Sequence, residues 1–344
     1  MAIAPSPVPE FAVIGGEQVE TYLAGRETET IALVEKTYLL HHQGDTVNPP
    51  SYFLRFPDRP ENRIIALPAS VGGSIGVDGV KWISSVPGNV ALGVPRASAV
   101  SILNDPATGY PLACVESSII SATRTAASAA LAATVLGADR RIETLTIVGG
   151  GLIARYVLHY LLAAGLTFRH VTLYDASDSH AAEFAEHLTR TLADTTVSIA
   201  ESAGSAVRSG DLVLLTTVAP EPYLTDASDF DHAPLVLNVS LRDVGVDVVL
   251  TACNIVDDVE HCLKADTSVH LAEQRTGNRD FLDGTLADVL LGRVQVPFDR
   301  TVVFSPFGLG VLDLAVAKRI YDELRDTGAL RELPGFFHEL QRLP

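Results

Sequence analysis

The chain has 344 residues, of which 47% are hydrophobic, and a formal net charge of -17 at pH 7. This length favours two domains, because a single hydrophobic core rarely grows beyond about 250–300 residues. The negative charge argues against nucleic acids and anionic membranes as partners, since both repel an acidic surface. No run of about 18 apolar residues predicts a membrane span. Residues 1–11 lack the basic and apolar stretches of a secretory signal.

The three cysteines, Cys114, Cys253 and Cys262, form no C-x-x-C pair. Their spacing indicates neither a zinc site nor a disulfide framework, so we expect no metal and a cytoplasmic location. The chain has 25 basic residues, but lysine occurs at four positions, so arginine is the default cation. A lysine at a strand position therefore needs a specific reason.

The first third of the chain changes from a helical to a β-type pattern. Apolar side chains recur at helical spacing over residues 17–43 and predict one helix there. From residue 51 to residue 115, short β-type runs are broken by proline and glycine. A turn signal at residues 104–109 should join the last two runs as a hairpin, which gives an antiparallel, β-rich first domain. The predicted strands are Tyr52–Phe56, Arg63–Leu67, Val80–Val86, Ala97–Leu103 and Tyr110–Glu116.

Residues 117–136 predict a helix of small residues, which Ser117 or Ser118 would cap and Gly137 would end. After Arg141, strands alternate with helical stretches, and this alternation predicts an α/β fold with a parallel, doubly wound sheet. A last helix at 311–326 has an apolar face that would pack back on the first domain. The predicted strands of the sheet are Thr144–Val148, His170–Tyr174, Thr196–Ala200, Asp211–Thr217, Leu235–Leu241, Asn254–Val256 and Thr301–Phe304.

A glycine-rich turn follows the first strand of this second domain. Residues 148–154, Val-Gly-Gly-Gly-Leu-Ile-Ala, fit the G-x-G-x-x-A dinucleotide fingerprint at a strand end that opens a helix. Gly149 permits the tight turn, Gly151 lets the backbone approach a pyrophosphate, and Ala154 allows close packing of the helix. Free N–H groups at the helix N-terminus, at Leu152 and Ile153, would bind the phosphates. A plain glycine-rich turn is the alternative.

Four further positions extend the expected cofactor site. Asp175 ends the next strand, 175 − 154 = 21 positions after Ala154, where the fingerprint places a ribose-binding acid. A carboxylate there repels a 2′-phosphate, and no arginine follows directly, so the sequence favours NAD over NADP; a helix cap is the alternative. Thr216 and Thr217 close a strand that should lie beside the first, and they could face the nicotinamide or be ordinary strand-end threonines. We also expect Ser240 to contact the cofactor.

Three cations are candidates for substrate binding. Arg124 lies in the small-residue helix, where its helical neighbours include no acid, so its guanidinium needs an anion such as a substrate carboxylate or a cofactor phosphate. Arg55 ends an aromatic strand and could hold a carboxylate through two hydrogen bonds. Lys81 lies on a half-buried strand, where a lowered pKa would suit proton transfer. Exposed cations, or for Arg124 a distant acid as partner, are the alternatives.

Asp243 follows the strand 235–241 at its carboxyl end, which is the edge where ligands bind to open α/β sheets. A carboxylate there could act as a general base, and a loop acid without a catalytic role is the alternative.

Together these segments resemble the ornithine cyclodeaminase/mu-crystallin family over nearly the whole chain. The resemblance implies a substrate-binding and dimerisation domain at 1–136 and 311–344, an NAD-binding Rossmann domain at 137–310, and a homodimer with a small amino-acid-derived substrate. It makes Arg55 and Lys81 substrate contacts, Arg124 a contact to substrate and cofactor, and Asp243 the proton donor and acceptor. The matching stretches are Leu67–Ala69, Gly79–Lys81, Pro87–Asn89, Gly93–Pro95, Asp105, Thr108–Gly109, Ser121–Ala127, Gly149–Ala154, Gly308 and Asp313–Ala315.

Two positions depart from typical ornithine cyclodeaminases. Arg96 stands where those enzymes have threonine, and Arg242 belongs to a Ser-Leu-Arg-Asp run that replaces a glycine-rich one. These variants look like a siderophore-pathway branch of the family that oxidises N-(2-amino-2-carboxyethyl)-L-glutamate and yields 2,3-diaminopropionate. That substrate is a tricarboxylate, and Arg96 and Arg242 could meet its additional charge.

The resemblance implies oxidation at the α-carbon of the glutamate portion by NAD⁺, which leaves an imine. Asp243, with Lys81, would then activate water, and the imine would be hydrolysed to 2-oxoglutarate and 2,3-diaminopropionate. The alternatives are ornithine cyclodeaminase, another amino-acid or cyclic-imine dehydrogenase, and a non-catalytic, crystallin-like ligand-binding protein. The presence of Lys81, Arg124 and Asp243 together weighs against the last.

Overall fold

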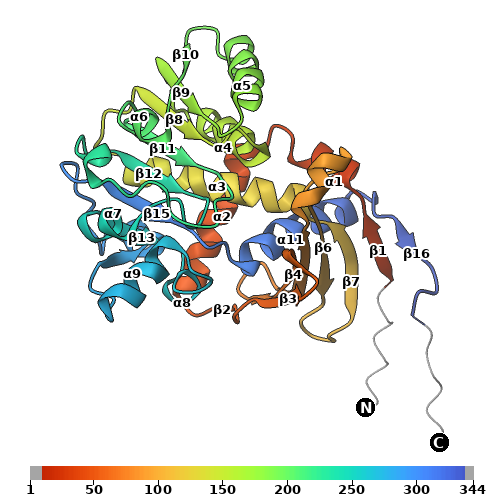
Figure 1. The fold of residues 1–344 in the computed structure, drawn as a ribbon. Helices are drawn as coiled ribbons and strands as arrows, with labels where there is room; N and C mark the ends of the chain where they lie inside the picture. The colour runs from red at the N-terminus through yellow and green to blue at the C-terminus, as the bar shows by residue number, and fades with distance from the viewer. Residues whose placement is uncertain (1–9, 338–344) are drawn as a thin grey trace, which may run out of the picture. The chain divides into compact units, whose positions relative to one another are not determined.

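The computed structural model describes residues 10–337 and divides the chain into two compact units (Figure 1). One unit contains Met1–Arg124 together with Leu309–Pro344, and the other contains Thr125–Gly308. The boundary therefore falls inside helix α3 (Ser118–Leu136), whereas the sequence analysis placed it after residue 136.

The first unit is built on a mostly antiparallel sheet. Its strands follow the order β16-β1-β7-β6-β5-β4-β2, and β3 pairs with β4 beside this path. The predicted hairpin is confirmed, because β6 and β7 pair antiparallel across the turn. The strands are β1 (Phe11–Ile14), β2 (Thr46–Val47), β3 (Tyr52–Phe56), β4 (Arg59–Val71), β5 (Val77–Ser85), β6 (Ala97–Asn104), β7 (Pro111–Glu116) and β16 (Glu332–Leu333).

The single helix predicted over residues 17–43 is wrong. The structure has two helices, α1 (Gly16–Leu23) and α2 (Glu27–His42), separated by a short turn. Gly25 takes a φ of 75° in this turn, a left-handed conformation that glycine adopts without strain and that ends a helix. The apolar periodicity runs through both helices and so concealed the break. A short 3-10 helix, η1 (Pro87–Leu92), precedes β6.

The last helix, α11 (Gly310–Asp326), packs on β4, β5 and β6 and beside α2 within the first unit, as the sequence predicted (Figure 1). Gly79 of β5 makes this close packing possible. A side chain there would collide with the carbonyl oxygen of Ile102 and would lie 3.2 Å from the Leu314 side chain of α11. The absence of a Cβ at Gly79 therefore lets α11 lie against the sheet.

The second unit is a parallel sheet in the order β10-β9-β8-β11-β12-β15-β13-β14. Counted from β8, the first five strands stand in the order 3-2-1-4-5, which is that of dinucleotide-binding folds. The predicted doubly wound α/β fold is confirmed. The strands are β8 (Thr144–Val148), β9 (His170–Tyr174), β10 (Thr196–Ile199), β11 (Leu212–Leu215), β12 (Leu235–Asn238), β13 (Cys253–Val256), β14 (Leu282–Thr285) and β15 (Val302–Ser305).

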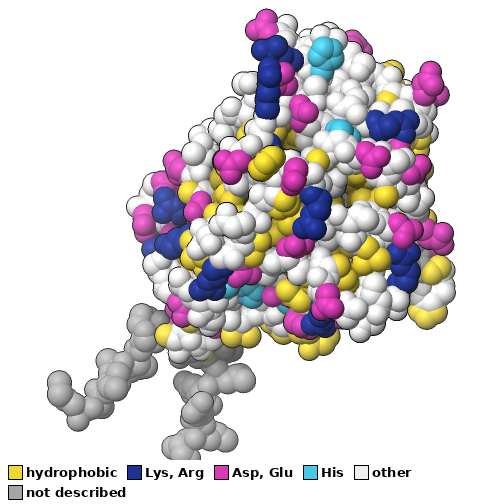
Figure 2. Space-filling view, turned by 90° about the vertical axis from the view of Figure 1, so that its left-hand side faces the viewer, with side chains coloured by type: hydrophobic (Ala, Val, Ile, Leu, Met, Phe, Trp, Pro, Cys, Tyr) yellow, Lys and Arg dark blue, Asp and Glu magenta, His cyan; other side chains and the backbone are white. Residues whose placement is uncertain are grey.

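The helices of this unit cover a sheet whose central strands, β11, β12, β13 and β15, are buried along their whole length, as expected of a parallel sheet. Figure 2 shows acidic and basic side chains interspersed over the face it presents, without a large basic block. The helices are α4 (Leu152–Ala163), α5 (Asp178–Thr191), α6 (Ala203–Val207), η2 (Ala227–Phe230), α7 (Val246–Thr251), α8 (Val259–Cys262), α9 (Ser268–Thr276) and α10 (Leu286–Leu290).

Helix α3 begins as predicted, but a different residue satisfies its first N–H groups. The backbone N–H groups of Ser118 and Ile119 donate to the two carboxylate oxygens of Glu116, at 2.7 and 3.2 Å. The hydroxyl of Ser117 instead donates to Ser101, and that of Ser118 accepts from the backbone of Ala99. The predicted serine cap is therefore wrong, because the adjoining sheet uses both hydroxyls.

By length and composition alone α3 is apolar enough to cross a membrane. However, 72% of its apolar window is buried inside the protein, so α3 is a core helix.

Replacing Glu116 with alanine should lower the free energy of unfolding by about 1 kcal/mol, the usual effect of removing a helix cap. The matched control is Glu183→Ala, an exposed acid on α5. The urea midpoint of each variant measures the change, and an equal midpoint for Glu116→Ala and the control would contradict the capping role.

Candidate active site

A buried ion cluster lies in the first unit, where β5, α3 and α11 meet. Lys81 Nζ donates to Asp313 Oδ2 at 2.6 Å and to the hydroxyl of Ser121 at 3.2 Å. Arg124 Nε donates to the other carboxylate oxygen of Asp313 at 3.1 Å. The exposed fractions are 2% for Lys81, 9% for Arg124 and 0% for Asp313. The cluster thus holds two cations on one carboxylate.

This imbalance of charge changes the acidity of the lysine. The pKa of Lys81 is lowered to about 8, chiefly because burial disfavours the charged form; Arg124 also lowers this pKa, while the Asp313 carboxylate raises it. Within the described part of the chain, Arg124 hydrogen-bonds through Nε, which leaves its two terminal nitrogens to bind a carboxylate in a bidentate manner. The cluster is therefore suited to hold an anion.

Asp313 was not among the predicted site residues. It is the distant acid left open as a partner for Arg124, and it lies 189 positions away in the sequence. One signal pointed to it. A single carboxylate interrupts the apolar run Gly-Val-Leu-Asp-Leu-Ala-Val-Ala at 310–317, and a buried carboxylate requires a partner.

The structure places the other predicted substrate arginines of this unit outside the ion cluster. Arg55 is exposed on β3, with its guanidinium carbon 5.2 Å from the centre of the Phe53 ring. Arg96 is half-buried and its Nε donates to Ser85 Oγ at 3.2 Å, while desolvation lowers its pKa. Ser85 lies four residues after Lys81 on β5 and so on the same face of the sheet.

In the second unit, the glycine turn has the backbone that a dinucleotide requires. Gly149 has a φ of 92°, and a Cβ there would lie 3.0 Å from the carbonyl carbon of Thr216. A Cβ added at Gly151 would meet no atom of the described residues within 4 Å, so the space beside this residue is open. Helix α4 begins at Leu152, and among the described side chains none caps it. Its first N–H groups are therefore available to phosphate oxygens, and the turn fits the pyrophosphate of NAD.

Asp175 lies at the end of β9, directly beside this turn. Its Oδ2 accepts a hydrogen bond from the backbone N–H of Gly150 at 2.8 Å, and its Oδ1 accepts one from Ser177 at 2.9 Å. Each oxygen keeps a lone pair, so the carboxylate can both hold the turn and accept from a ribose hydroxyl.

Asp243 is fully buried in a loop that follows β12. Thr217 Oγ1 donates to Asp243 Oδ1 at 2.6 Å, and the hydroxyl of Tyr223 donates to Oδ2 at 3.0 Å. Desolvation raises the pKa of Asp243, although hydrogen bonds from Thr217, Ser240 and Tyr223 oppose the rise. A raised pKa makes a buried carboxyl a better proton acceptor, as a general base requires. Tyr223 was missed, because a lone loop tyrosine carries no spacing signal.

The loop before Asp243 is strained. Leu241 has a φ of 73°, a conformation uncommon for residues other than glycine and often found at functional sites. Arg242 donates through its terminal nitrogens to the carbonyl oxygens of Pro220 and Ala265, at 3.2 and 3.0 Å. These two hydrogen bonds stabilise the loop, so two of the Arg242 donors serve the loop structure.

Among residues 10–337, no cluster of three or more histidine, cysteine, aspartate or glutamate side chains is arranged to hold a metal ion. The three cysteines are free thiols.

Known proteins resemble this chain over most of its length. The N-((2S)-2-amino-2-carboxyethyl)-L-glutamate dehydrogenase of Staphylococcus aureus is 31% identical over 82% of this chain and 86% of the relative. The alanine dehydrogenase of Archaeoglobus fulgidus is 26% identical over 91% of this chain and 95% of that enzyme. The structure of Thermococcus litoralis Δ1-pyrroline-2-carboxylate reductase with NADH and L-proline superimposes with a TM-score of 0.85, at 23% identity, over 94% of this chain and 100% of that one.

The family model for ornithine cyclodeaminases and mu-crystallins matches residues 16–328, which is nearly the whole described chain. The parallel sheet of the second unit, the glycine turn at its first strand and the buried acids of both units agree with that match. The chain belongs to the ornithine cyclodeaminase/mu-crystallin family.

Proposed function

We propose that this protein is an NAD-dependent oxidoreductase that oxidises N-(2-amino-2-carboxyethyl)-L-glutamate and releases 2,3-diaminopropionate and 2-oxoglutarate. The observation that carries the proposal is the ion cluster, in which Lys81 and Arg124 are buried with Asp313 as their carboxylate partner. Such an excess of buried positive charge requires an anion, and an acidic amino-acid derivative supplies one. The resemblance to the Staphylococcus aureus dehydrogenase supports this choice of substrate.

In the first unit, the terminal nitrogens of Arg124 would bind a substrate carboxylate, with the Lys81 ammonium beside it. Asp313 holds both cations in place through its two oxygens. Arg55 and Arg96 are proposed to bind the additional carboxylates of this tricarboxylate. Arg242 is proposed to act mainly by holding the loop that carries Asp243, given its carbonyl contacts.

In the second unit, the glycine turn from Gly149 to Ala154 would hold the pyrophosphate and Asp175 the ribose. Thr216 donates to the carbonyl oxygen of Gly149 at 2.7 Å and so fixes the turn. Bound there, NAD⁺ would supply a hydride acceptor for the α-carbon of the substrate, and this oxidation would leave a carbon–nitrogen double bond.

Asp243 would then carry the protons of the hydrolysis. Its carboxylate takes a proton from water as the oxygen adds to the imine carbon. It returns that proton to the nitrogen, and it takes the proton of the new hydroxyl group as the carbon–nitrogen bond breaks, which gives the ketone and the free amine. Thr217 and Tyr223 orient the two oxygens and keep the carboxyl in one position.

We also propose a homodimer formed through the outer face of the first sheet. Tyr52, Ala66, Trp82 and Val100 lie opposite one another on four neighbouring strands and form one cross-strand row. Tyr52 and Trp82 are 67% and 45% exposed, and apolar rows of this kind usually mark an interface.

The cytoplasm suits such an enzyme, because its cysteines are free thiols.

The direct test incubates the purified protein with NAD⁺ and N-(2-amino-2-carboxyethyl)-L-glutamate and follows NADH by its absorbance. Asp243→Asn should lower turnover by about 100-fold or more, since it removes the proton carrier, while NADH still binds by fluorescence. Asp247→Asn, an exposed acid on α7, is the control.

Unchanged turnover in Asp243→Asn would remove that residue from the mechanism. Proline formed from ornithine without net NADH would make the protein an ornithine cyclodeaminase. NADH formed with another amino acid or a cyclic amine, but not with this substrate, would replace the substrate. Absence of turnover with all of them would favour a non-catalytic binding protein.

The cofactor preference should depend on the charge of Asp175. Asp175→Asn keeps an oxygen for the Gly150 N–H but no longer repels a 2′-phosphate. The ratio of NADH affinity to NADPH affinity should fall by about tenfold or more, measured by fluorescence titration. Asp178→Asn, an exposed acid at the start of α5, should leave the ratio unchanged. Equal ratios in both variants would refute a ribose role for Asp175.

The pH dependence of kcat/KM should reflect the ionisation of Lys81 in the ion cluster. Because protonated Lys81 attracts the substrate, kcat/KM should fall as pH rises through its pKa of about 8. Asp313→Asn removes the carboxylate that raises this pKa, so the fall should begin at lower pH. Profiles between about pH 6 and pH 9 measure the shift.

Two controls accompany this measurement. Asp326→Asn, an exposed acid on the same helix, should leave the profile in place. Asp313→Asn also leaves buried cations less well paired, at a cost of about 3–5 kcal/mol, so thermal unfolding must show that the variant is folded. A folded Asp313→Asn variant with the wild-type profile would contradict the assignment to Lys81.

A further inference from the structure

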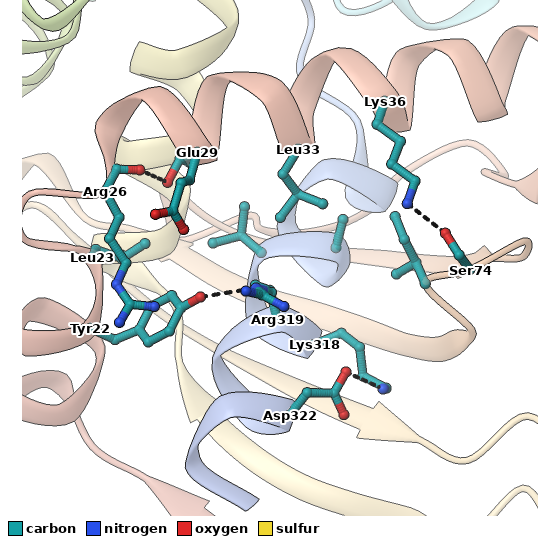
Figure 3. Close-up of a pocket in the computed structure, with 14 residues that line it drawn as sticks. Tyr22, Leu23, Arg26, Glu29, Leu33, Lys36, Ser74, Lys318, Arg319 and Asp322 are labelled. Atoms are coloured by element: carbon teal, nitrogen blue, oxygen red, sulfur yellow. Dashed lines mark hydrogen bonds and ion pairs between the residues drawn. The ribbon is translucent and has the colours of Figure 1, made fainter. Parts of the chain in front are cut away.

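A cavity of about 250 Å³ lies in the first unit between α2 and α11 (Figure 3). Residues of α1, α2, α11 and the Ser74–Ile75 turn line it, and none of the candidate active-site residues does. Ligand sites usually measure about 300–1,000 Å³, so this cavity has the size for a small metabolite and is too small for a nucleotide.

The cavity concentrates positive charge in an acidic protein. The whole chain has 42 acidic and 25 basic residues. Four cations and two acids line the cavity, which reverses that ratio, and two of the chain's four lysines are among them. The charged lining residues are Arg26, Lys36, Lys318, Arg319, Glu29 and Asp322.

Two of these cations form the first half of an anion site. Arg26 Cζ lies 4.3 Å from the centre of the Tyr22 ring, and Arg319 Nε donates to the Tyr22 hydroxyl at 3.2 Å. Tyr22 thus holds both guanidiniums at one end of the cavity (Figure 3). One carboxylate oxygen of Glu323 lies 4.0 Å from a terminal nitrogen of each guanidinium, which is beyond hydrogen-bonding distance. Their donors therefore remain able to bind an anion.

A third cation lies at the other end of the cavity. Lys36 lies on α2, ten positions after Arg26, the residue that precedes this helix; this is about 15 Å along the helix axis, and the Lys36 ammonium donates to Ser74 Oγ. Leu33 projects from α2 between them (Figure 3), and Ile75 also lines the cavity. The cavity therefore has an apolar middle with cations at both ends.

The fourth cation is already paired. Lys318 Nζ donates to Asp322 Oδ2 at 2.6 Å, one helical turn further along α11. This pair contributes little net charge, so the anion-binding groups are Arg26, Arg319 and Lys36, with Glu29 and Glu323 as the nearby acids.

We propose that this cavity binds a small aliphatic dicarboxylate. One carboxylate would lie between Arg26 and Arg319, where guanidiniums bind carboxylates in a bidentate manner, and the carbon chain would direct the other toward the Lys36 end of the cavity. The methylene groups between them would contact Leu33 and Ile75. Inorganic phosphate would satisfy one end and leave the apolar middle unfilled, which disfavours it.

Helix α11 connects this cavity to the ion cluster. Arg319 and Asp313 are six positions apart on it, so a ligand that ties α2 to α11 would also restrain the carboxylate that holds Lys81 and Arg124. Regulation by this route rests on the proposed function, whereas the binding itself does not.

The test is isothermal titration of the full-length protein with glutarate, up to about 10 mM, which saturates a site of sub-millimolar Kd. Arg26→Gln and Arg319→Gln should each raise the Kd for glutarate by about tenfold or more. Arg190→Gln, an exposed arginine on α5 that pairs with Glu186, is the matched control and should leave the Kd unchanged. Arg319→Lys should bind with intermediate affinity, because it keeps the charge and loses the fork.

Three outcomes would overturn the proposal. The first is no heat of binding with glutarate. The second is an equal Kd in wild type, Arg26→Gln and Arg319→Gln, which would place the ligand elsewhere, for instance at Lys81 and Arg124. The third is inorganic phosphate binding as tightly as glutarate with the same dependence on the two arginines, which would make this a phosphate site.

Discussion

The carboxylate of Asp313 is fully buried and is shared by two buried cations, Lys81 and Arg124. Each partner comes from a different element, so the ion cluster exists only when β5, α3 and α11 pack together. Removing one partner of a buried pair usually costs about 3–5 kcal/mol, and stability and anion binding therefore depend on the same contact. Gly79 permits it, because a side chain there would push α11 away from the sheet.

Asp313 of the first unit and Asp243 of the second are both buried, but their surroundings differ. Asp313 has cations as partners, and those cations hold its charge. Asp243 is surrounded by the hydroxyls of Thr217 and Tyr223, and burial raises its pKa. Two carboxyls in different surroundings can serve different purposes, one to fix charge and one to exchange protons. The strained backbone at Leu241 positions the second of them.

Helix α11 presents different chemistry along its length. Its buried first turns carry Asp313 into the ion cluster, and its later turns carry Lys318, Arg319 and Asp322 to the cavity beside α2. This acidic chain therefore gathers some of its cations at two places that we propose as anion sites, while charges of both signs are mixed on the face that Figure 2 shows. Local clusters of positive charge thus occur in a chain whose net charge is negative.

The sequence by itself determined the parallel sheet, its glycine turn and the positions of Asp175 and Asp243, because these depend on strand periodicity and on residues close in the chain. It could not show the break at Gly25, since apolar periodicity continues across it. Only the tertiary structure decided that Lys81 and Arg124 share Asp313, from 232 and 189 positions away. A buried charge takes its partner from whichever segment packs against it, and local patterns carry no information about that choice.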